Sequence, residues 1–270
     1  MLEIRDIYKT FNPDTPDEVK ALQGVTFRME EGSFVAVLGT NGSGKSTLLN
    51  AVAGSFQVDF GKILLGGEDI TALSEHQRAR HIGRVFQNPF TGTAPDMSIA
   101  ENLALASLRG RKRGLGWAVS SRTAEEFKAR IRELNMGLED RLGNIIGKLS
   151  GGQRQALTLL MASWLKPKLL LLDEHTAALD PKTAKKVIEL TEQIIEKDHL
   201  TTLMVTHSMQ QAVNLGDRLI MMNKGKIIYD FRGDEKRRLR ANDLLALFDE
   251  VRRKEQIDHT TAEMLSRVYV

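Results

Sequence analysis

Hydrophobic and polar residues alternate over the first thirty positions of the chain and follow a different pattern afterwards. Residues 2–8 (LEIRDIY) and 19–29 (VKALQGVTFRM) alternate, and the turn-rich segment NPDTPD lies between them. This pattern predicts two antiparallel strands. The next hydrophobic segment, 33–39 (SFVAVLG), is continuous, which is typical of a strand buried on both faces of a parallel sheet. A glycine-rich segment then leads into a predicted helix over 45–54.

The middle of the chain changes from strand-like to helical patterning. Strands are predicted at 61–70 and 81–87, and the residues that follow have helical spacing as far as about Pro167. We therefore predict a helical subdomain, at about 88–167, inserted into a sheet-forming chain. Its expected helices lie within 98–108, 122–136 and 151–165.

The sheet pattern returns after the insertion. Strands are predicted at 168–174 and 201–207, on either side of a helix over 181–197. A hairpin over 217–231 is expected to turn at Asn223-Lys224-Gly225, where glycine supplies a positive φ. Strands that alternate with helices imply right-handed βαβ crossovers and a mostly parallel sheet. The predicted fold class is α/β, with an N-terminal antiparallel β subdomain and an inserted α-helical subdomain.

Composition narrows the functional classes. The net charge of +3 over 270 residues is too small to indicate nucleic-acid binding, so no nucleic-acid partner is expected. The absence of cysteine fits a reducing compartment. The longest apolar run, 169–172, has the length of a core strand, far short of the roughly 20 residues that cross a bilayer. The start, MLEIRDIYKT, lacks the pattern of a signal peptide. Any role at a membrane therefore requires docking on another protein.

Two basic clusters lie outside these strands. RGRKRG, 109–114, is predicted to be a solvated loop, with contact to anionic lipid or a partner as the alternative. KRRLR, 236–240, precedes a charged tail in which apolar residues have helical spacing. We predict one domain over 1–235 and a helical tail over 236–270, packed on the body through Leu244, Leu245, Leu247 and Phe248.

A phosphate-binding loop is predicted at residues 39–46, GTNGSGKS, which fit the pattern G-x-x-x-x-G-K-[ST] between a strand and a helix. Glycines let backbone N–H groups turn inward around phosphates, and the helix N-terminus adds positive potential. Lys45 would reach the β- and γ-phosphates of ATP, and the Ser46 hydroxyl would bind Mg²⁺. An ordinary strand-to-helix loop is the alternative. The predicted nucleotide-binding residues here are Gly39, Asn41, Gly42, Ser43, Gly44, Lys45, Ser46 and Thr47.

A second element of the same chemistry is LLLLDE, 169–174. Four apolar residues bury a strand and deliver two acids to its C-terminal end, where open α/β sheets bind ligands. Asp173 would hold Mg²⁺, directly or through water. Glu174 would orient and deprotonate the attacking water. Any core strand can end in acids, so this element is specific only because it follows a phosphate loop.

A further glycine motif, LSGGQ at 149–153, opens a predicted helix about twenty residues before Asp173. One ATP needs one phosphate loop, so in isolation Ser150 could merely cap its helix and the glycines could merely allow a turn. With the other motifs in order, the sequence resembles the nucleotide-binding domains of ABC transporters, for which LSGGQ is the family signature. The resemblance covers residues 2 to about 232 and implies a RecA-like P-loop core with the helical subdomain inserted.

The resemblance implies that two copies face each other head to tail, each signature closing over the ATP bound by the partner. It assigns Ser150, Gly151, Gly152 and Gln153 to the partner's nucleotide. Phe11 is similar to the aromatic that stacks on adenine, Gln87 to a residue that links Mg²⁺ and the attacking water to the helical subdomain, and His207 to a histidine that contacts the γ-phosphate. Asp180, in TAALD, is similar to the interface acid, although Pro181 after it also suits a helix cap. The corresponding alternatives are a core phenylalanine, a surface glutamine and a structural histidine.

Two positions depart from the usual family sequence DEPTSALD. His175 replaces proline and Ala177 replaces serine, and neither change removes a catalytic group. His175 is expected to fill space, with a titratable interface contact as the alternative. The catalytic set, Glu174, His207 and Gln87, is complete, so an active Mg²⁺-dependent ATPase is predicted.

A single nucleotide-binding domain without a fused membrane domain is similar to a stand-alone subunit that docks on a separate permease. Residues 90–103 (FTGTAPDMSIAENL) would grip the permease, and the subunit would lie at the cytoplasmic face of the membrane, bound through it. The resemblance favours uptake of a small solute such as an amino acid or sugar, with an extracytoplasmic binding protein. An exporter, a lipid or lipoprotein extraction system and a soluble non-transport ATPase remain alternatives.

Overall fold

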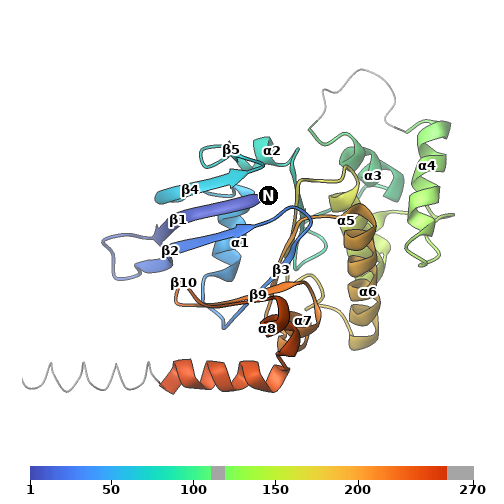
Figure 1. Cartoon of the computed structure of the whole chain (residues 1–270). Helices are drawn as coiled ribbons and strands as arrows, with labels where there is room; N and C mark the ends of the chain where they lie inside the picture. Colours follow the sequence, from blue (N-terminus) through green and yellow to red (C-terminus); the bar gives the residue numbers. More distant parts are fainter. Residues whose placement is uncertain (111–118, 254–270) are drawn as a thin grey trace, which may run out of the picture.

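Two β-sheets organise the computed structural model, which describes residues 1–110 and 119–253 (Figure 1). The N-terminal sheet is antiparallel throughout, in the order β2-β1-β4-β5. This confirms the predicted antiparallel start. Its strands are β1 (Leu2–Phe11), β2 (Val19–Met29), β4 (Phe60–Leu65) and β5 (Glu68–Asp69).

The second sheet has the order β10-β9-β3-β8-β7-β6, and only its β9–β10 pair is antiparallel. The mostly parallel core is therefore confirmed. Because β3, β7 and β8 are parallel neighbours, their C-terminal ends meet at one edge of the sheet. The strands are β3 (Phe34–Gly39), β6 (Ile82–Val85), β7 (Leu169–Asp173), β8 (Thr202–Thr206), β9 (Arg218–Asn223) and β10 (Lys226–Arg232).

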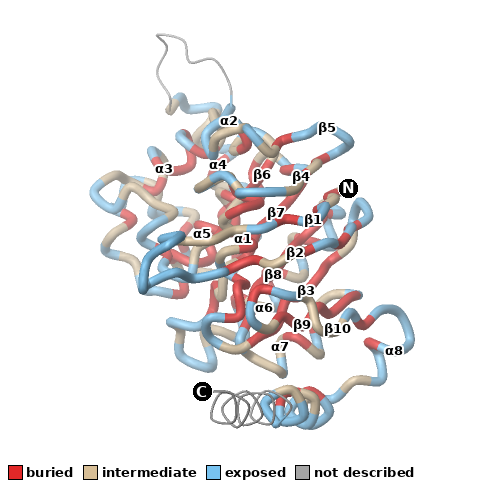
Figure 2. Tube along the Cα trace, turned by 90° about the vertical axis from the view of Figure 1, so that its left-hand side faces the viewer, coloured by how far each residue is buried: buried red, intermediate tan, exposed pale blue. Residues whose placement is uncertain are grey.

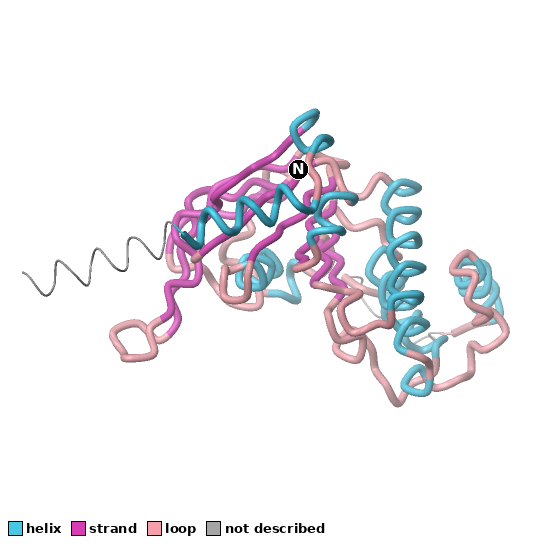
Figure 3. The backbone as a smooth tube through the Cα atoms, turned by 90° about the horizontal axis from the view of Figure 1, so that it is seen from below, coloured by secondary structure: helices cyan, strands magenta, loops and turns pink. Residues whose placement is uncertain are grey.

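Helices cover both faces of this sheet. Helix α1 (Lys45–Ala53) packs between the two sheets, where Leu48 and Val52 share a buried cluster with Ile4 and Val37. The helices of the insertion pack on the opposite face and are set to one side of the strands (Figure 3). They are α3 (Ile99–Ser107), α4 (Ser121–Arg132) and α5 (Gly151–Ser163), followed in the chain by α6 (Pro181–Asp198) and α7 (Met209–Asn214). Short turns of helix form α2 (Glu75–Arg78), η1 (Ile146–Lys148) and α8 (Gly233–Arg238).

Buried residues are concentrated on the strands and on the inner faces of the helices (Figure 2). The predicted tail helix is present over 241–253, as far as the structure describes it. Leu244 and Phe248 are buried in the core, but Leu245 is 48% exposed, so its predicted packing is wrong. Within the two described ranges, no helix has the length and apolarity that crossing a membrane demands.

The structure corrects one predicted strand, confirms the predicted hairpin turn and corrects the environment predicted for Arg109. The strand expected at 61–70 is interrupted at Gly66 and Gly67, which both have positive φ and form a turn between β4 and β5. At the β9–β10 turn, Lys224 has a positive φ as well as Gly225. This is the pattern of a two-residue type I′ turn. The basic cluster is predicted to be solvated, but its first residue, Arg109, is partly buried and donates to the Ala162 carbonyl at 3.0 Å. Most of the predicted basic loop lies outside the described residues.

Candidate functional site

The glycine-rich loop connects β3 to α1 and wraps around the Lys45 side chain. Gly42 and Gly44 have φ values of 77° and 97°, a region open chiefly to glycine. A Cβ on Gly44 would lie 2.5 Å from the Ala21 carbonyl oxygen, so the loop also lies tightly against β2. Lys45 Nζ donates to the carbonyls of Gly39 and Thr40, at 3.0 Å each. The loop thus has the tight, glycine-dependent turns of a phosphate-binding loop, and the lysine side chain is held within it.

Lys45 is the cation of this loop, and the Ser43 hydroxyl is a second donor beside it. Burial lowers the pKa of Lys45, and the charges of Glu174 and Asp173 oppose that shift. The Ser43 hydroxyl is buried, and its oxygen has no hydrogen-bond partner among the described residues. A buried hydroxyl without a partner is costly unless a ligand satisfies it. The loop therefore fits a phosphate group that accepts from Ser43 and Lys45.

Three predicted catalytic residues meet beside the loop. Glu174 follows β7, His207 follows β8, and Gln87 lies after β6. The Glu174 Oε2 oxygen is 3.1 Å from His207 Nδ1 and accepts from Gln87 Nε2 at 3.4 Å. Glu174 has a φ of +42°, an unfavourable backbone conformation for a residue with a side chain. The structure brings these three side chains together from separate parts of the chain.

Asp173 lies beside this group and has a partner that the motifs did not predict. Its Oδ2 oxygen is 3.6 Å from Arg84 Nη2. Burial raises the pKa of Asp173 against the opposing charge of Arg84, and the neighbouring Glu174 raises it further. Lys45 opposes the shift as well, and a further positive charge near this carboxylate, such as a bound cation, would favour its ionised form.

The donor set fits Mg²⁺ rather than a metal bound entirely by protein. No three His, Cys, Asp or Glu side chains converge on a metal site within residues 1–110 and 119–253. Mg²⁺ usually takes one or two carboxylates, phosphate oxygens and water. Asp173, the Ser46 hydroxyl and the Gln87 amide oxygen are oxygen donors of that kind.

A single cleft of about 610 Å³ collects most of the predicted site. Gly39, Asp173, the LSGGQ residues and Asp180 are not among its lining residues. Val19 and Ala21 are, although the sequence analysis did not anticipate either. The predicted residues that line the cleft are Phe11, Asn41, Gly42, Ser43, Gly44, Lys45, Ser46, Thr47, Gln87, Glu174 and His207.

The signature residues lie elsewhere and have structural roles in their own chain. Ser150 Oγ accepts from the Gln153 backbone N–H at 3.3 Å, and Gln153 Oε1 accepts from the Ser150 N–H, which together cap α5. Gly152 is buried against Thr183 of α6, whereas Gly151 is exposed. Asp180 similarly caps α6 by accepting from the Thr183 N–H at 3.1 Å. Ser150 and Asp180 thus both act as helix caps, and Gly151, between the cap and the buried Gly152, is exposed on the surface.

Two further aromatic or histidine predictions can be placed. Phe11 lines the cleft and contacts Phe56 edge to face, with ring centroids 5.4 Å apart. His175 is only 2% exposed, and burial lowers its pKa to about 4. Its Nε2 lies 3.0 Å from Thr191 Oγ1, whose own proton goes to the Val187 carbonyl, so His175 Nε2 is the donor. His175 therefore fills space in the core, as expected, and its lowered pKa keeps it neutral at pH 7.

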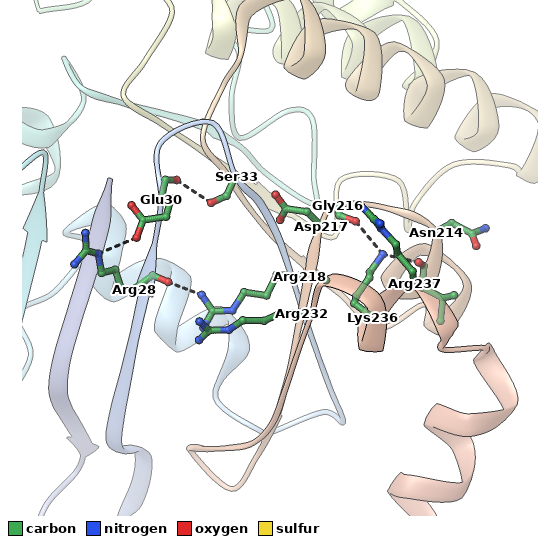
Figure 4. A pocket seen from close by; sticks show the side chains of 12 residues that line it. Arg28, Glu30, Ser33, Asn214, Gly216, Asp217, Arg218, Arg232, Lys236 and Arg237 are labelled. Atoms are coloured by element: carbon green, nitrogen blue, oxygen red, sulfur yellow. Dashed lines mark hydrogen bonds and ion pairs between the residues drawn. The ribbon is translucent and has the colours of Figure 1, made fainter.

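A second cleft, of about 750 Å³, lies near α8 and is lined by several cationic side chains (Figure 4). Its two buried cations already have partners. Lys236 Nζ donates to three backbone carbonyls at the end of α7, at 2.6 to 3.0 Å. Arg218 shares the Asp230 carboxylate with Arg232. This cleft contains none of the motif residues, so the candidate functional site is the one around Lys45.

Comparison with known proteins agrees with this geometry. A family model described as ABC transporter matches residues 22–177. A tyrosine transport ATP-binding protein of Clostridioides difficile is 41% identical over 92% of this chain and 99% of its own length. A sulfate/thiosulfate import ATP-binding protein of Methylococcus capsulatus is 38% identical over 84% of this chain, which spans 61% of that relative.

Solved structures give the same result. A dimeric, post-hydrolysis ATP-binding cassette bound to ADP and Pi aligns with a TM-score of 0.73 and 27% identity, covering 86% of this chain and 98% of that one. A nucleotide-free ATP-binding cassette from an ABC transporter aligns with a TM-score of 0.73 and 28% identity, covering 87% and 92%.

Proposed function

This chain belongs to the ABC transporter family, and on that premise we propose that it is the ATP-hydrolysing subunit of a solute uptake system. In this proposal two copies bind ATP between them and act on a separate membrane permease, at its cytoplasmic face. The observation that carries the proposal is the cleft in which the glycine loop meets Gln87, Glu174 and His207.

The arrangement of the catalytic side chains supports hydrolysis. Gln87 and His207 both contact the Glu174 Oε2 oxygen, which leaves Oε1 as the oxygen that would accept a hydrogen bond from the attacking water. Lys45 would leave its loop carbonyls to bind the β- and γ-phosphates. Asp173, Ser46 and Gln87 would hold Mg²⁺, which neutralises developing charge on the phosphates.

The position of the signature supports a pair of copies. Ser150 and Gly151 lie outside the cleft that contains Lys45 in the same chain. The N-terminus of α5, with its backbone N–H groups, suits a γ-phosphate that another copy binds. The dimeric form of a related cassette supports the same assembly.

The relatives support uptake and suggest an amino acid as the solute. The relative that this chain covers almost completely is named for tyrosine transport. A xylose/arabinose import ATP-binding protein of Sulfolobus acidocaldarius is 34% identical over 87% of this chain, so the same ATPase type serves chemically different solutes. We propose an amino acid uptake system that includes an extracytoplasmic binding protein. An exporter and a soluble ATPase are alternatives without a specific supporting observation.

The permease would dock on the loop between β6 and α3. Phe90 in this loop is 48% exposed, and the Arg154 guanidinium lies 3.5 Å from its ring centroid. The loop has a fixed shape, because the buried Asn102 side chain accepts from the Ala94 N–H and donates to the Ala94 and Ser98 carbonyls. A rigid loop with an exposed aromatic suits a partner helix.

The test uses the Glu174→Gln variant, which should bind MgATP without hydrolysing it. Light scattering after gel filtration should show a dimer with MgATP and a monomer without nucleotide. Adding Gly151→Asp should abolish the dimer by like-charge repulsion, while an acid at the start of α5 is locally tolerated. Lys45→Ala should abolish turnover in the otherwise unchanged chain. A strictly monomeric Glu174→Gln variant at saturating MgATP, or undiminished turnover in Lys45→Ala, would overturn the proposal.

A further inference from the structure

The acid and the histidine of the cleft lie on two separate loops whose spacing must be maintained. Glu174 follows β7 and His207 follows β8, and the two strands are parallel neighbours. The backbone N–H of Glu174 donates to the Val205 carbonyl at 3.0 Å, which joins the loops at their bases. The 3.1 Å contact between Glu174 Oε2 and His207 Nδ1 then depends on how each loop continues beyond its strand.

The Glu174 loop requires support because its backbone is strained. A φ of +42° costs a residue with a side chain about 1–2 kcal/mol. Such a conformation persists only where the surrounding structure over-determines it. One support is the buried His175 ring, which donates to Thr191 of α6. A second support is a hydrogen bond to the Thr176 hydroxyl from a residue that also contacts the loop of His207.

Gln211 of α7 provides that second support and bridges both loops. Its Nε2 donates to Thr176 Oγ1 at 2.9 Å, and its Oε1 accepts from Thr206 Oγ1 at 2.9 Å. Thr176 lies two residues after Glu174, and Thr206 lies directly before His207. Both hydroxyl-bearing residues are buried. One amide therefore connects the loop of the carboxylate to the loop of the imidazole.

The hydrogen bonds around this amide form one consistent pattern. Thr206 Oγ1 accepts from the Ser208 backbone N–H at 3.0 Å and donates its single hydroxyl proton to Gln211 Oε1. The NH₂ end of the amide faces Thr176 and donates to its hydroxyl. The Gln211 backbone N–H donates to Ser208 Oγ at 3.3 Å, which anchors the residue in the first turn of α7.

We propose that Gln211 is a positioning residue for ATP hydrolysis, which holds Glu174 and His207 in register through Thr176 and Thr206. It does not line the ATP cleft, so it acts through these loops and leaves ATP binding unchanged. This inference rests on the proposed function, because it requires Glu174 to be the residue that activates water.

The test compares two substitutions of Gln211 with one at its exposed neighbour in α7, Gln210. Gln211→Leu keeps the approximate size and removes both hydrogen bonds, and should lower kcat about 10-fold with KM for MgATP within about twofold. Gln211→Glu can accept from both threonine hydroxyls and should restore kcat to within about threefold of the unaltered chain. Gln210→Leu should leave both constants unchanged.

A second variant keeps the test decisive if Gln211→Leu folds poorly, as judged by its Tm. Thr176→Val should also lower kcat. The double variant should lose no more activity than the worse single variant, because each change alone already breaks the link between the two loops. Equal losses in Gln211→Leu and Gln211→Glu, or a raised KM with unchanged kcat, would overturn the proposal. Turnover that survives Glu174→Gln would instead overturn the proposed function together with this inference.

Discussion

The substitution Gly152→Ala tests whether a signature glycine is required by packing within its own chain. Gly152 lies in the first turn of α5, facing the first turn of α6. A Cβ at this position would lie 2.0 Å from Thr183 Cγ2, whereas ordinary contacts begin at 3.4 Å. The two atoms would therefore have to separate by about 1.4 Å, the difference between these two distances.

The expected cost follows from what can move. The Thr183 backbone N–H donates to the Asp180 side chain, which caps the same helix, so the contact must be relieved by the Thr183 side chain or by a shift of α6 as a whole. Two of the three staggered χ1 positions of threonine carry a heavy atom, so one rotamer alone would relieve the contact. Overpacking of this kind costs about 1–3 kcal/mol, and alanine recovers about 0.5–1 kcal/mol relative to glycine in a helix. We expect a net loss of about 1–2 kcal/mol, which lowers Tm by about 2–8 °C.

The assay is thermal unfolding without nucleotide, so that any contact with a partner's ATP is excluded. Gly151→Ala is the matched control, because a Cβ there would lie 3.3 Å from the flexible end of Leu179 and should leave Tm nearly unchanged. Thr183→Ser removes the clashing methyl group and keeps the backbone bond to Asp180, so it should restore the Tm of Gly152→Ala. Equal Tm values for the two alanine variants, or no rescue by Thr183→Ser, would refute the packing argument.

Two further predictions concern the cationic cleft near α8. Lys236→Met should lower the free energy of unfolding by about 2–3 kcal/mol, because it removes the donor that three carbonyls share. Urea unfolding measures this loss, with Arg237→Met at the exposed neighbouring position as the control. Equal urea midpoints for the two variants would contradict the reasoning. Burial alone would raise the pKa of Asp230, but hydrogen bonds from Arg218 and Arg232 outweigh it and lower this pKa to about 2. The folded-state pKa lies below the unfolded value of about 3.8, so these ion pairs stabilise the folded chain by about 1 kcal/mol after solvent screening of this partly exposed carboxylate. This stabilisation is complete above about pH 5 and is lost as the pH falls toward 2. Asp230→Asn should thus be less stable than the unaltered chain at pH 7, and urea unfolding should show that this gap is smaller at pH 3; a gap independent of pH would contradict the assignment.

The site residues at the C-terminal ends of the parallel strands could be predicted from the sequence, because each directly follows a recognisable hydrophobic strand. Lys45 and Ser46 follow a buried strand and begin a helix, and Asp173 and Glu174 end another buried strand. Parallel strands align their C-terminal ends, so hydrophobic runs and the residues after them sufficed to place these groups together. Whether each group has its predicted catalytic role remains a prediction.

Contacts between elements could not be predicted in the same way. Arg84 reaches Asp173 because β6 pairs with β7, and no spacing in the sequence specifies that pairing. Gln211 bridges two loops only because the fold places the first turn of α7 beside both Thr176 and Thr206. The hydrophobic pattern of the tail likewise indicated a helix but could not separate buried Leu244 from exposed Leu245, since the contact face depends on how the helix docks.

Substitutions of Gly151 and of Gly152 differ in how clearly they can test the proposed contact with the nucleotide of a second copy. Lost activity in a Gly152 variant would combine damage to the α5–α6 contact with any lost contact to ATP, because position 152 is buried against Thr183. Ser150 has the same ambiguity, since its hydroxyl caps α5 and removing a cap costs about 1 kcal/mol. Gly151 is exposed and adjoins only the end of one flexible side chain. An effect of Gly151 substitution on ATP-dependent dimerisation, at unchanged Tm, can therefore be attributed to the second copy.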